Sequence, residues 1–475
     1  MYPYRTRRAA GISAIFFIVL FLIVIIGTGW LLLTDKGKFW DLLPFICIPS
    51  VIINLVLFIF YFAKRNIAGY IFTLFFLIFL TGVLLSSFYG PFRLYRDAVD
   101  AYENKQYGVS AEKFASVVKN YPTSKYSADS TKNLVYSYYL DSRYQEAIEY
   151  FNLSIEKELV ESENLEIKKI LSESYYKLGE IHYSGKQYEL AAQNFLASVD
   201  YFKEISAKFP DTNEAFVAKY KVPELLYKAA ESHKNTKQWD DAIEILDELK
   251  AIYPDSEYYK SAENLLYYIY IMKSGELKAD GRSGESIEVL VKVLELDSES
   301  LNYNKYQVKS RLFSLLQGIR ETVIIETADR LFLQGKNSQA LFIYGYVYEK
   351  YPDFRQTIIM NYIDCNIRIA LAESNTSLET LLQTEPTGFI GKEGFAKVSF
   401  ENKTGFQIII FIKGPEYEIL ELDNELKTEL DLTAGNYSIL VLPSEEGARP
   451  FYGELLYEDG ARYREVFNSD SDVNN

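Results

Sequence analysis

The chain has 475 residues, 48% of them hydrophobic, and a formal net charge of −15. This length allows several domains. The acidic balance disfavours nucleic acid and anionic lipid as ligands, so no nucleic-acid partner is expected. The two cysteines, Cys47 and Cys365, lie far apart in the sequence, and Cys47 falls in an apolar run, so no internal disulfide is expected. This cysteine usage fits a reducing compartment, or a bacterial exterior where a large core needs no disulfides.

Three apolar runs without charged side chains occupy the first 90 residues, at Ala9–Leu33, Leu42–Ala63 and Ile67–Tyr89. At about 1.5 Å per helical residue, each is long enough to cross a hydrocarbon core of about 30 Å. Residues 1–90 are therefore predicted to form a three-helix transmembrane anchor that contacts the bilayer through residues 9–89. A cleavable signal peptide is the competing interpretation of the first run, which is too long for one and lacks a cleavage site.

Basic residues beside these runs predict their orientation. Arg5, Arg7 and Arg8 precede the first run, and Lys64 with Arg65 links the second to the third, so both positions are expected inside the cytoplasm. A multi-pass plasma-membrane protein with an extracytoplasmic body follows. Basic residues beyond the third run offset most of this bias, which leaves a cytoplasmic body as the alternative. The absence of charge within the runs favours an anchor over a transporter.

Residues 91–373 have helical periodicity and contain a recurring pattern. In six units a small residue precedes a large apolar one by four positions, which places both on one helix face. The small residue lets a neighbouring helix approach, and the large one fills the groove beside it. The residues predicted to pack the repeats are Phe114, Ala147, Phe151, Gly179, Ala191, Phe195, Ala242, Leu246, Ala340 and Tyr344.

Leu178-Gly179 with Tyr183, Ala191 and Phe195 resembles the tetratricopeptide repeat (TPR). Segments 121–126 and 253–258 resemble a version of this repeat that is common in bacterial envelope proteins. The distances between units exceed 34 residues, so long first helices and an insertion near residues 206–221 are expected. The resemblance implies an all-α superhelix whose concave face binds protein or peptide partners.

Candidate residues for such a groove are aromatic, with lysines nearby for partner carboxylates. The alternative is that each tyrosine packs between helices and each lysine belongs to a solvated face. The candidate tyrosines are Tyr138, Tyr176, Tyr183, Tyr227 and Tyr267, and the lysines are Lys132, Lys177 and Lys228.

A linker at residues 374–391 precedes short alternating runs that predict seven strands within residues 392–467. They are expected to form a small, compact antiparallel all-β sandwich. The turn Thr433–Tyr437 is similar to those of transthyretin-like and carboxypeptidase-regulatory-like sandwiches, which implies a contact module or a rigid spacer. A passive cap is the alternative. The polar residues 468–475 are expected to be disordered.

Reactive side chains are sparse in this sequence. His182 and His233 have no second histidine or cysteine at ligand spacing, so structural roles are expected for both. Cys365 has no histidine in its vicinity, and Gly281–Gly284 is expected to be a turn. No enzymatic activity, cofactor or metal is predicted.

Together these patterns predict a multi-domain protein with three transmembrane helices, then an all-α TPR-like superhelix, then a small all-β sandwich. The expected function is a membrane-anchored scaffold that binds protein or peptide partners at the bacterial cell envelope. Two alternatives stay open. One is an accessory subunit of a membrane transport or secretion complex, and the other is a cytoplasm-facing adaptor that recruits proteins to the membrane.

Overall fold

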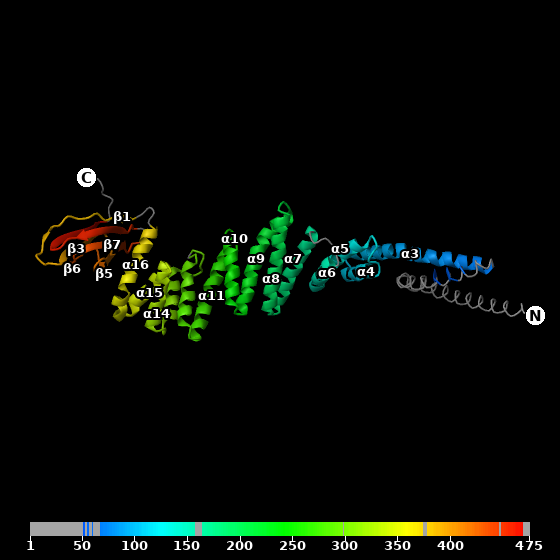
Figure 1. Ribbon diagram of the computed structural model, residues 1–475, viewed down its shortest axis with the longest axis horizontal. Coiled ribbons are helices and arrows are strands. Elements are labelled where there is room, and N and C mark those ends of the chain that lie inside the picture. Colours follow the sequence, from blue (N-terminus) through cyan, green and yellow to red (C-terminus); the bar gives the residue numbers. More distant parts are fainter. Residues whose placement is uncertain are drawn as a thin grey trace, which may run out of the picture. The chain divides into compact units, whose positions relative to one another are not determined.

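The computed structural model describes residues 51–52, 55–56, 59, 67–156, 164–297, 299–373, 378–445 and 448–468. The chain forms two compact units, Met1–Gln238 and Trp239–Asn475 (Figure 1). The apolar run Ala9–Leu33 and most of Leu42–Ala63 lie outside the described residues, as do residues 469–475 of the predicted tail 468–475.

The third apolar run belongs to helix α3 (Ile67–Glu103). This helix continues without a break through Arg93, Arg96 and Asp97, so the run is not an element of its own. Across the described part of the chain, no helix combines the length and the apolarity needed to cross a bilayer. The prediction of three transmembrane helices is therefore wrong as a description of this fold, and the expected bilayer contact through residues 9–89 has no support.

Antiparallel helices build the first unit after α3 (Figure 1). They are α4 (Tyr107–Asn120), α5 (Ser127–Leu140), α6 (Tyr144–Glu156), α7 (Leu165–Ser184), α8 (Tyr188–Lys208) and α9 (Asn213–Asn235). Side chains cap the two long first helices. Asn164 accepts a hydrogen bond from the Ile167 amide at 3.2 Å, and Thr212 accepts one from Ala215 at 3.2 Å, which satisfies free amides at both helix starts.

The second unit begins with more helices of the same kind. They are α10 (Trp239–Ile252), α11 (Tyr259–Ala279), α12 (Ser283–Val291), η1 (Lys292–Glu295), α13 (Lys305–Leu316), α14 (Glu321–Leu333), α15 (Asn337–Lys350), η2 (Pro352–Phe354) and α16 (Arg355–Glu373). Helix α13 has no counterpart in the repeating pattern. Its start is set by a capping box between Asn304 and Gln307.

Six turns in the described chain share one backbone signature. In each turn, the second residue after the end of the first helix of a predicted pair has φ between 58° and 78°. After α7, for example, the Gln187 amide donates to the His182 carbonyl at 2.8 Å and the Lys186 amide to Tyr183 at 3.0 Å, which is a Schellman motif. The left-handed residues are Lys105, Ser142, Lys186, Lys237, Gly281 and Gly335. Their number agrees with the six units read from the sequence.

Replacement of Lys186 by glycine is expected to raise the free energy of unfolding by about 0.5–1 kcal/mol, because glycine adopts the left-handed conformation without strain. Gly335→Ala is the reverse test, because it places a side chain on a left-handed residue. The added methyl group would meet open space, so only the backbone conformation of Gly335, with φ of +76°, disfavours it. That variant is expected to lose about 1 kcal/mol. Urea unfolding followed by circular dichroism checks both, and a loss of stability in Lys186→Gly or a gain in Gly335→Ala would refute the assignment of strain.

All ten residues predicted to pack the repeats are buried. The tightest contact joins Gly179 of α7 to Phe195 of α8, where an added Cβ would lie 2.5 Å from the phenyl ring. Phe195 is itself fully buried, so the ring has nowhere to move. The two helices can therefore approach this closely only because Gly179 has no side chain.

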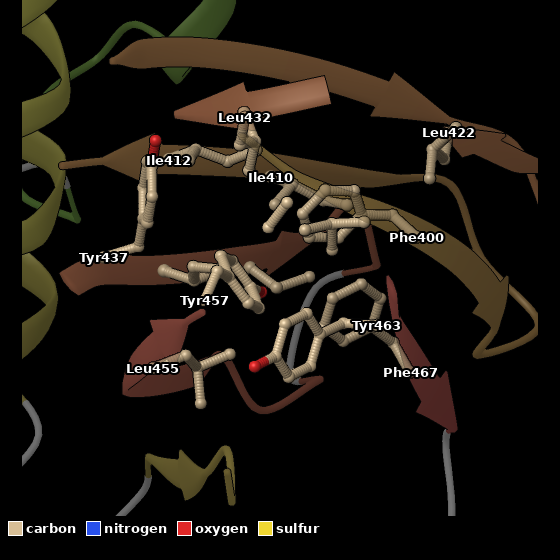
Figure 2. Packing of buried hydrophobic residues seen from close by; sticks show 14 of the residues in the cluster. Phe400, Ile410, Ile412, Leu422, Leu432, Tyr437, Leu455, Tyr457, Tyr463 and Phe467 are labelled. Carbon is tan, nitrogen blue, oxygen red and sulfur yellow. The ribbon is translucent and has the colours of Figure 1, made fainter. Parts of the chain in front are cut away.

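A small β region follows α16, as expected, and its two sheets enclose one apolar core (Figure 2). The strand orders are β1-β8-β7-β4-β5 and β2-β9-β3-β6. The strands are β1 (Glu379–Thr380), β2 (Gly388–Phe389), β3 (Phe395–Lys403), β4 (Ile408–Lys413), β5 (Tyr417–Leu422), β6 (Lys427–Thr433), β7 (Gly435–Pro443), β8 (Phe451–Tyr457) and β9 (Ala461–Asn468). Seven of these coincide with the predicted strands.

Two features of this region differ from the sequence prediction. The segment expected to be a linker supplies β1 and β2, each two residues long, so part of it is built into the sheets. The sandwich is also not wholly antiparallel, because β3 pairs with β9 and β1 with β8 in parallel. Both parallel pairs join strands far apart in the sequence, which hairpin patterns do not reveal.

Helix α16 covers the outer face of the five-stranded sheet. Ile363 of α16 is fully buried and packs in one cluster with Phe411 of β4 and Leu440 of β7. Lys413 Nζ lies 2.7 Å from Asp364 Oδ1 beside this contact. Strand β7 is apolar at consecutive positions because one face meets the sandwich core and the other meets α16.

Glu465 is a buried carboxyl group inside this region, 4% exposed. It accepts hydrogen bonds from Thr384 Oγ1 at 2.8 Å and from the Tyr457 hydroxyl at 3.2 Å. Burial raises the pKa of Glu465, and the two hydrogen bonds offset only part of this rise. Thr384 belongs to the segment between β1 and β2, so Glu465 helps to hold that segment in place.

Glu465→Gln is therefore expected to stabilise the protein by about 1 kcal/mol at pH 8 and less at pH 5. The folded-state pKa lies above the unfolded one, so the carboxyl favours folding below the unfolded pKa. That contribution is lost as pH rises through the folded pKa, whereas glutamine does not titrate. Melting temperatures of the wild-type protein and the variant at the two pH values test this. The same difference in melting temperature at pH 5 and pH 8 would contradict it.

Candidate binding face of the helical repeats

The first helices of three consecutive pairs, α5, α7 and α9, contact one another in order within the first unit. Their facing side chains alternate between aromatic, acidic and basic groups. We call this set the first-helix face. It consists of Lys132, Tyr136, Tyr139, Glu166, Lys169, Glu173, Tyr176, Lys177, Glu180, Tyr183, Glu214, Lys221, Glu224, Lys228 and Glu231.

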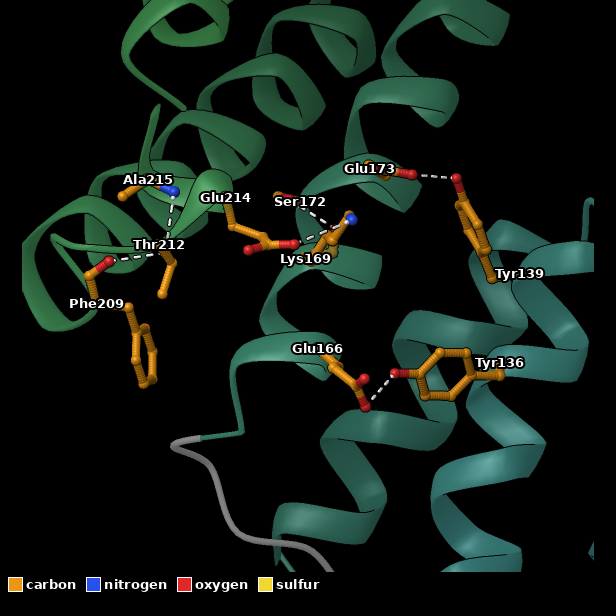
Figure 3. A network of polar contacts seen from close by, with 10 residues as sticks. All are labelled: Tyr136, Tyr139, Glu166, Lys169, Ser172, Glu173, Phe209, Thr212, Glu214 and Ala215. Atoms are coloured by element: carbon orange, nitrogen blue, oxygen red, sulfur yellow. Dashed lines mark hydrogen bonds and ion pairs between the residues drawn. The ribbon is translucent and has the colours of Figure 1, made fainter. Parts of the chain in front are cut away.

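Two tyrosines of α5 donate hydrogen bonds to carboxylates of α7 (Figure 3). The Tyr136 hydroxyl lies 2.9 Å from Glu166, which also pairs with Lys132 at 2.7 Å, and Tyr139 donates to Glu173. Hydrogen bonds from Lys132 and Tyr136 lower the pKa of Glu166, while burial and the nearby carboxylates raise the pKa of both tyrosines. The tyrosines thus stay protonated donors and Glu166 an ionised acceptor.

Ion pairs join α7 to α9 in the same way. Lys169 lies 3.3 Å from Glu214 (Figure 3), and Lys228 lies 2.7 Å from Glu180 and 3.3 Å from Glu224. Burial alone would lower the pKa of Lys228, but the hydrogen bond to Glu180 and the nearby acidic groups raise it overall. The ammonium group therefore stays charged within the face.

The ring of Tyr176 lies at the centre of these contacts. Ammonium groups of Lys177, Lys221 and Lys228 lie 5.2, 4.9 and 5.0 Å from its centroid. Lys221 also pairs with Glu224 at 2.8 Å. A cation over a tyrosine ring is a weak attraction at an exposed site, and exposed ion pairs are of similar strength, so both kinds of contact help to hold these side chains.

The structure changes the expectation for the candidate lysines. Lys132 and Lys228 are engaged by carboxylates of the chain itself, so neither is held ready for a partner's carboxylate. Lys177 is exposed and contacts the Tyr176 ring. Lys132 and Lys228 therefore fit the alternative, in which the lysines belong to a solvated face and pair with carboxylates of the same chain.

The structure places the five candidate tyrosines in different surroundings. Tyr176 and Tyr183 lie on the first-helix face, whereas Tyr138 packs between α5 and α6 against Tyr150 at 6.3 Å. Tyr227 of α9 is partly buried. Tyr267 belongs to the second unit, where it is 8% exposed and contacts Tyr303 at 4.9 Å.

Sequence reasoning missed Tyr136, Tyr139 and the carboxylates that accept from them. A usable signal was present, because Glu166, Glu173 and Glu180 recur every seven residues and so share one face of α7. That stripe identifies the face of α7 that turns toward its neighbours.

Both histidines occupy equivalent positions next to a turn. His182 Nδ1 lies 2.7 Å from Gln187 Oε1, and His233 Nδ1 lies 2.8 Å from Gln238 Oε1. Cys365 is buried, and burial raises the pKa of its thiol to about 12. In the part of the chain that the structure describes, no three His, Cys, Asp or Glu residues gather as metal ligands would.

Two protein families match parts of the chain. The tetratricopeptide repeat model matches residues 224–256, and the model of the outer membrane lipoprotein family YfiO matches residues 90–224. Together with the six turns, these matches confirm the predicted TPR-type repeats. Neither match reaches the β region, and its resemblance to transthyretin-like sandwiches has no support. The comparison with curated proteins found no match to this chain.

Three solved structures illustrate the likeness to TPR proteins. The TPR domain of P58(IPK) has 13% identity and a TM-score of 0.24, covering 62% of this chain and 70% of that one. The TPR2AB domain of yeast Sti1, in a complex with pHSP90, has 11% identity and a TM-score of 0.20, covering 58% and 98%. A tetratricopeptide repeat protein from Parabacteroides merdae has 14% identity and a TM-score of 0.19, covering 48% and 99%.

Proposed function

We propose that this TPR-type protein is a non-catalytic scaffold that binds a protein partner along its first-helix face. The observation that supports this most is the network joining α5, α7 and α9. Its tyrosines and ion pairs fix three consecutive helices relative to one another, and a preorganised surface loses less entropy on binding. The segment matched by the YfiO family, residues 90–224, carries most of this face.

The same match supports a location at the cell envelope, because the family is described as an outer membrane lipoprotein. In this proposal the β region is a second contact surface. A subunit of a transport or secretion complex is a more specific form of the same function. Separation of cells into envelope and soluble fractions tests the location, and recovery of the protein in the soluble fraction would refute an envelope location.

Lys177→Glu tests the binding face with little risk to the fold, because this side chain is exposed on α7. Gln193→Glu is the matched control, since Gln193 is exposed on α8 of the same repeat. Full-length protein and both variants are expressed in cells, purified with their bound partners and compared by quantitative mass spectrometry. A partner lost about tenfold with the first variant and retained with the second is expected, whereas equal recovery would refute this face.

A further inference from the structure

Strand β5 (Tyr417–Leu422) forms one edge of the five-stranded sheet, because β4 is the only strand that pairs with it in the described part of the chain. The backbone groups on the other side of β5 therefore pair with no strand there. Strand β6 ends the second sheet in the same way and follows β5 after a short turn. An edge strand with unpaired backbone groups can accept a further strand, which then extends the sheet.

Both sides of β5 offer apolar surface to an added strand. Leu420 and Leu422 pack with the core of the sandwich, whereas Tyr417 and Ile419 pack with the cluster at α16. Three of these four side chains, all except Leu422, remain partly exposed. An added strand would therefore cover apolar surface on each side of the sheet, which favours its binding.

Two carboxylates of β5 face opposite sides of the sheet. Side chains alternate along a strand, so Glu418 lies on the side of Leu420 and Leu422, and Glu421 lies on the side of Tyr417. The two positions are three residues apart. Side chains that met both carboxylates would therefore also lie three residues apart on the added strand.

The charge around this edge is strongly negative. Residues 416–431 contain seven acidic side chains and one lysine. Both carboxylates of β6 pair with lysines of neighbouring segments, at 2.9 and 3.4 Å. Among the residues that the structure describes, no lysine or arginine pairs with Glu418 or Glu421. The uncompensated charge is thus concentrated on β5 and not on β6.

Glu418 restricts which strand can be added. Burial and the neighbouring Glu416 carboxylate raise the pKa of Glu418, so its charged form lacks compensation. A second copy of β5 would add further carboxylates beside it, and like charges across a strand pair are destabilising. An apolar strand would bury Glu418 further without a partner. A lysine or arginine opposite Glu418 would instead complete an ion pair, so this edge selects a basic strand.

We propose that the β5 edge binds an extended segment of a partner protein as an added strand, in which two basic residues stand three positions apart around two apolar ones. Backbone hydrogen bonds hold such a segment, and the two carboxylates select its charge pattern. The spacing is the same for parallel and antiparallel addition. This inference rests on the proposed role of the β region as a second contact surface and does not involve the first-helix face.

Fluorescence anisotropy with the purified full-length protein tests the inference. The labelled probe is the end-blocked peptide Thr-Lys-Val-Val-Lys-Thr, and its control is Thr-Lys-Val-Lys-Val-Thr, which has the same composition and charge. We expect saturable binding of the probe and binding of the control about tenfold more weakly, because both lysines of the control face one side of the strand. Equal affinity of the two peptides would overturn the inference.

Glu418→Gln/Glu421→Gln removes both charges with little change of shape and is expected to weaken binding of the probe about tenfold or more. Glu385→Gln/Glu458→Gln is the matched control variant, because both side chains are exposed and lie outside β5 and β6. This control is expected to bind the probe as the wild-type protein does. The same loss in both variants would mean that net charge alone attracts the peptide, against the inference.

Hydrogen exchange locates the bound peptide without any substitution. The probe is expected to slow exchange of amides in β5, and protection that spares β5 would overturn the inference. Cellular capture that depends on Lys177, combined with no saturable binding of the probe, would remove the basic added strand and leave the proposed function standing.

Discussion

Gly179→Ala is expected to lower the free energy of unfolding by about 2–3 kcal/mol, because the added Cβ would lie 2.5 Å from the Phe195 ring. The ring is fully buried and cannot swing aside, so the two helices must separate. Urea unfolding followed by circular dichroism measures the loss. Hydrogen exchange in α7 and α8 shows whether the loosening starts at this contact.

Gly275→Ala is the matched control for this prediction. Gly275 lies inside helix α11, and an added Cβ there meets nothing within 4 Å. Alanine has a higher helix propensity than glycine, so this variant is expected to gain about 0.5–1 kcal/mol. If the two substitutions had the same effect, close helix approach at Gly179 would not be what the glycine provides.

Ile363→Ala is expected to cost about 2–4 kcal/mol, because the side chain is fully buried between α16 and the five-stranded sheet. The substitution removes apolar contacts to Phe411 and Leu440 and leaves a cavity. Thermal unfolding followed by circular dichroism is expected to shift downward, and hydrogen exchange is expected to become faster in both α16 and the five-stranded sheet.

Met360→Ala is the control on the same helix. Met360 is 48% exposed, so its loss is expected to change the free energy of unfolding by less than about 0.5 kcal/mol. Equal effects of the two substitutions would mean that the contact between α16 and the sheet contributes little. Loss of stability in the helices alone would mean that the β region folds without α16.

The repeats were predictable because their packing depends on local spacing. A small residue four positions before a large one, as in Ala191 and Phe195, places both on one face whatever the rest of the chain does. The turns were less visible, since Lys105, Ser142, Lys186 and Lys237 adopt the left-handed conformation without being glycine. Helix-ending hydrogen bonds impose that conformation, and residue type alone does not indicate it.

The errors have equally specific causes. The apolar run Ile67–Tyr89 satisfied a length rule, whereas the structure continues it as the first part of α3. Strands β1 and β2 are too short to show any period. The pairing of Lys132 with Glu166 and of Lys228 with Glu180 joins residues 34 and 48 positions apart, which helical periodicity cannot predict.

Photo-crosslinking in living cells tests the central claim, binding along the first-helix face, most directly. A photoreactive amino acid replaces Lys177 on α7 in one strain and Gln193 on α8 in another, since both positions are exposed. The account predicts that one defined protein crosslinks from position 177 and much less from position 193. No crosslinked protein at 177, or the same yield at both positions, would contradict it.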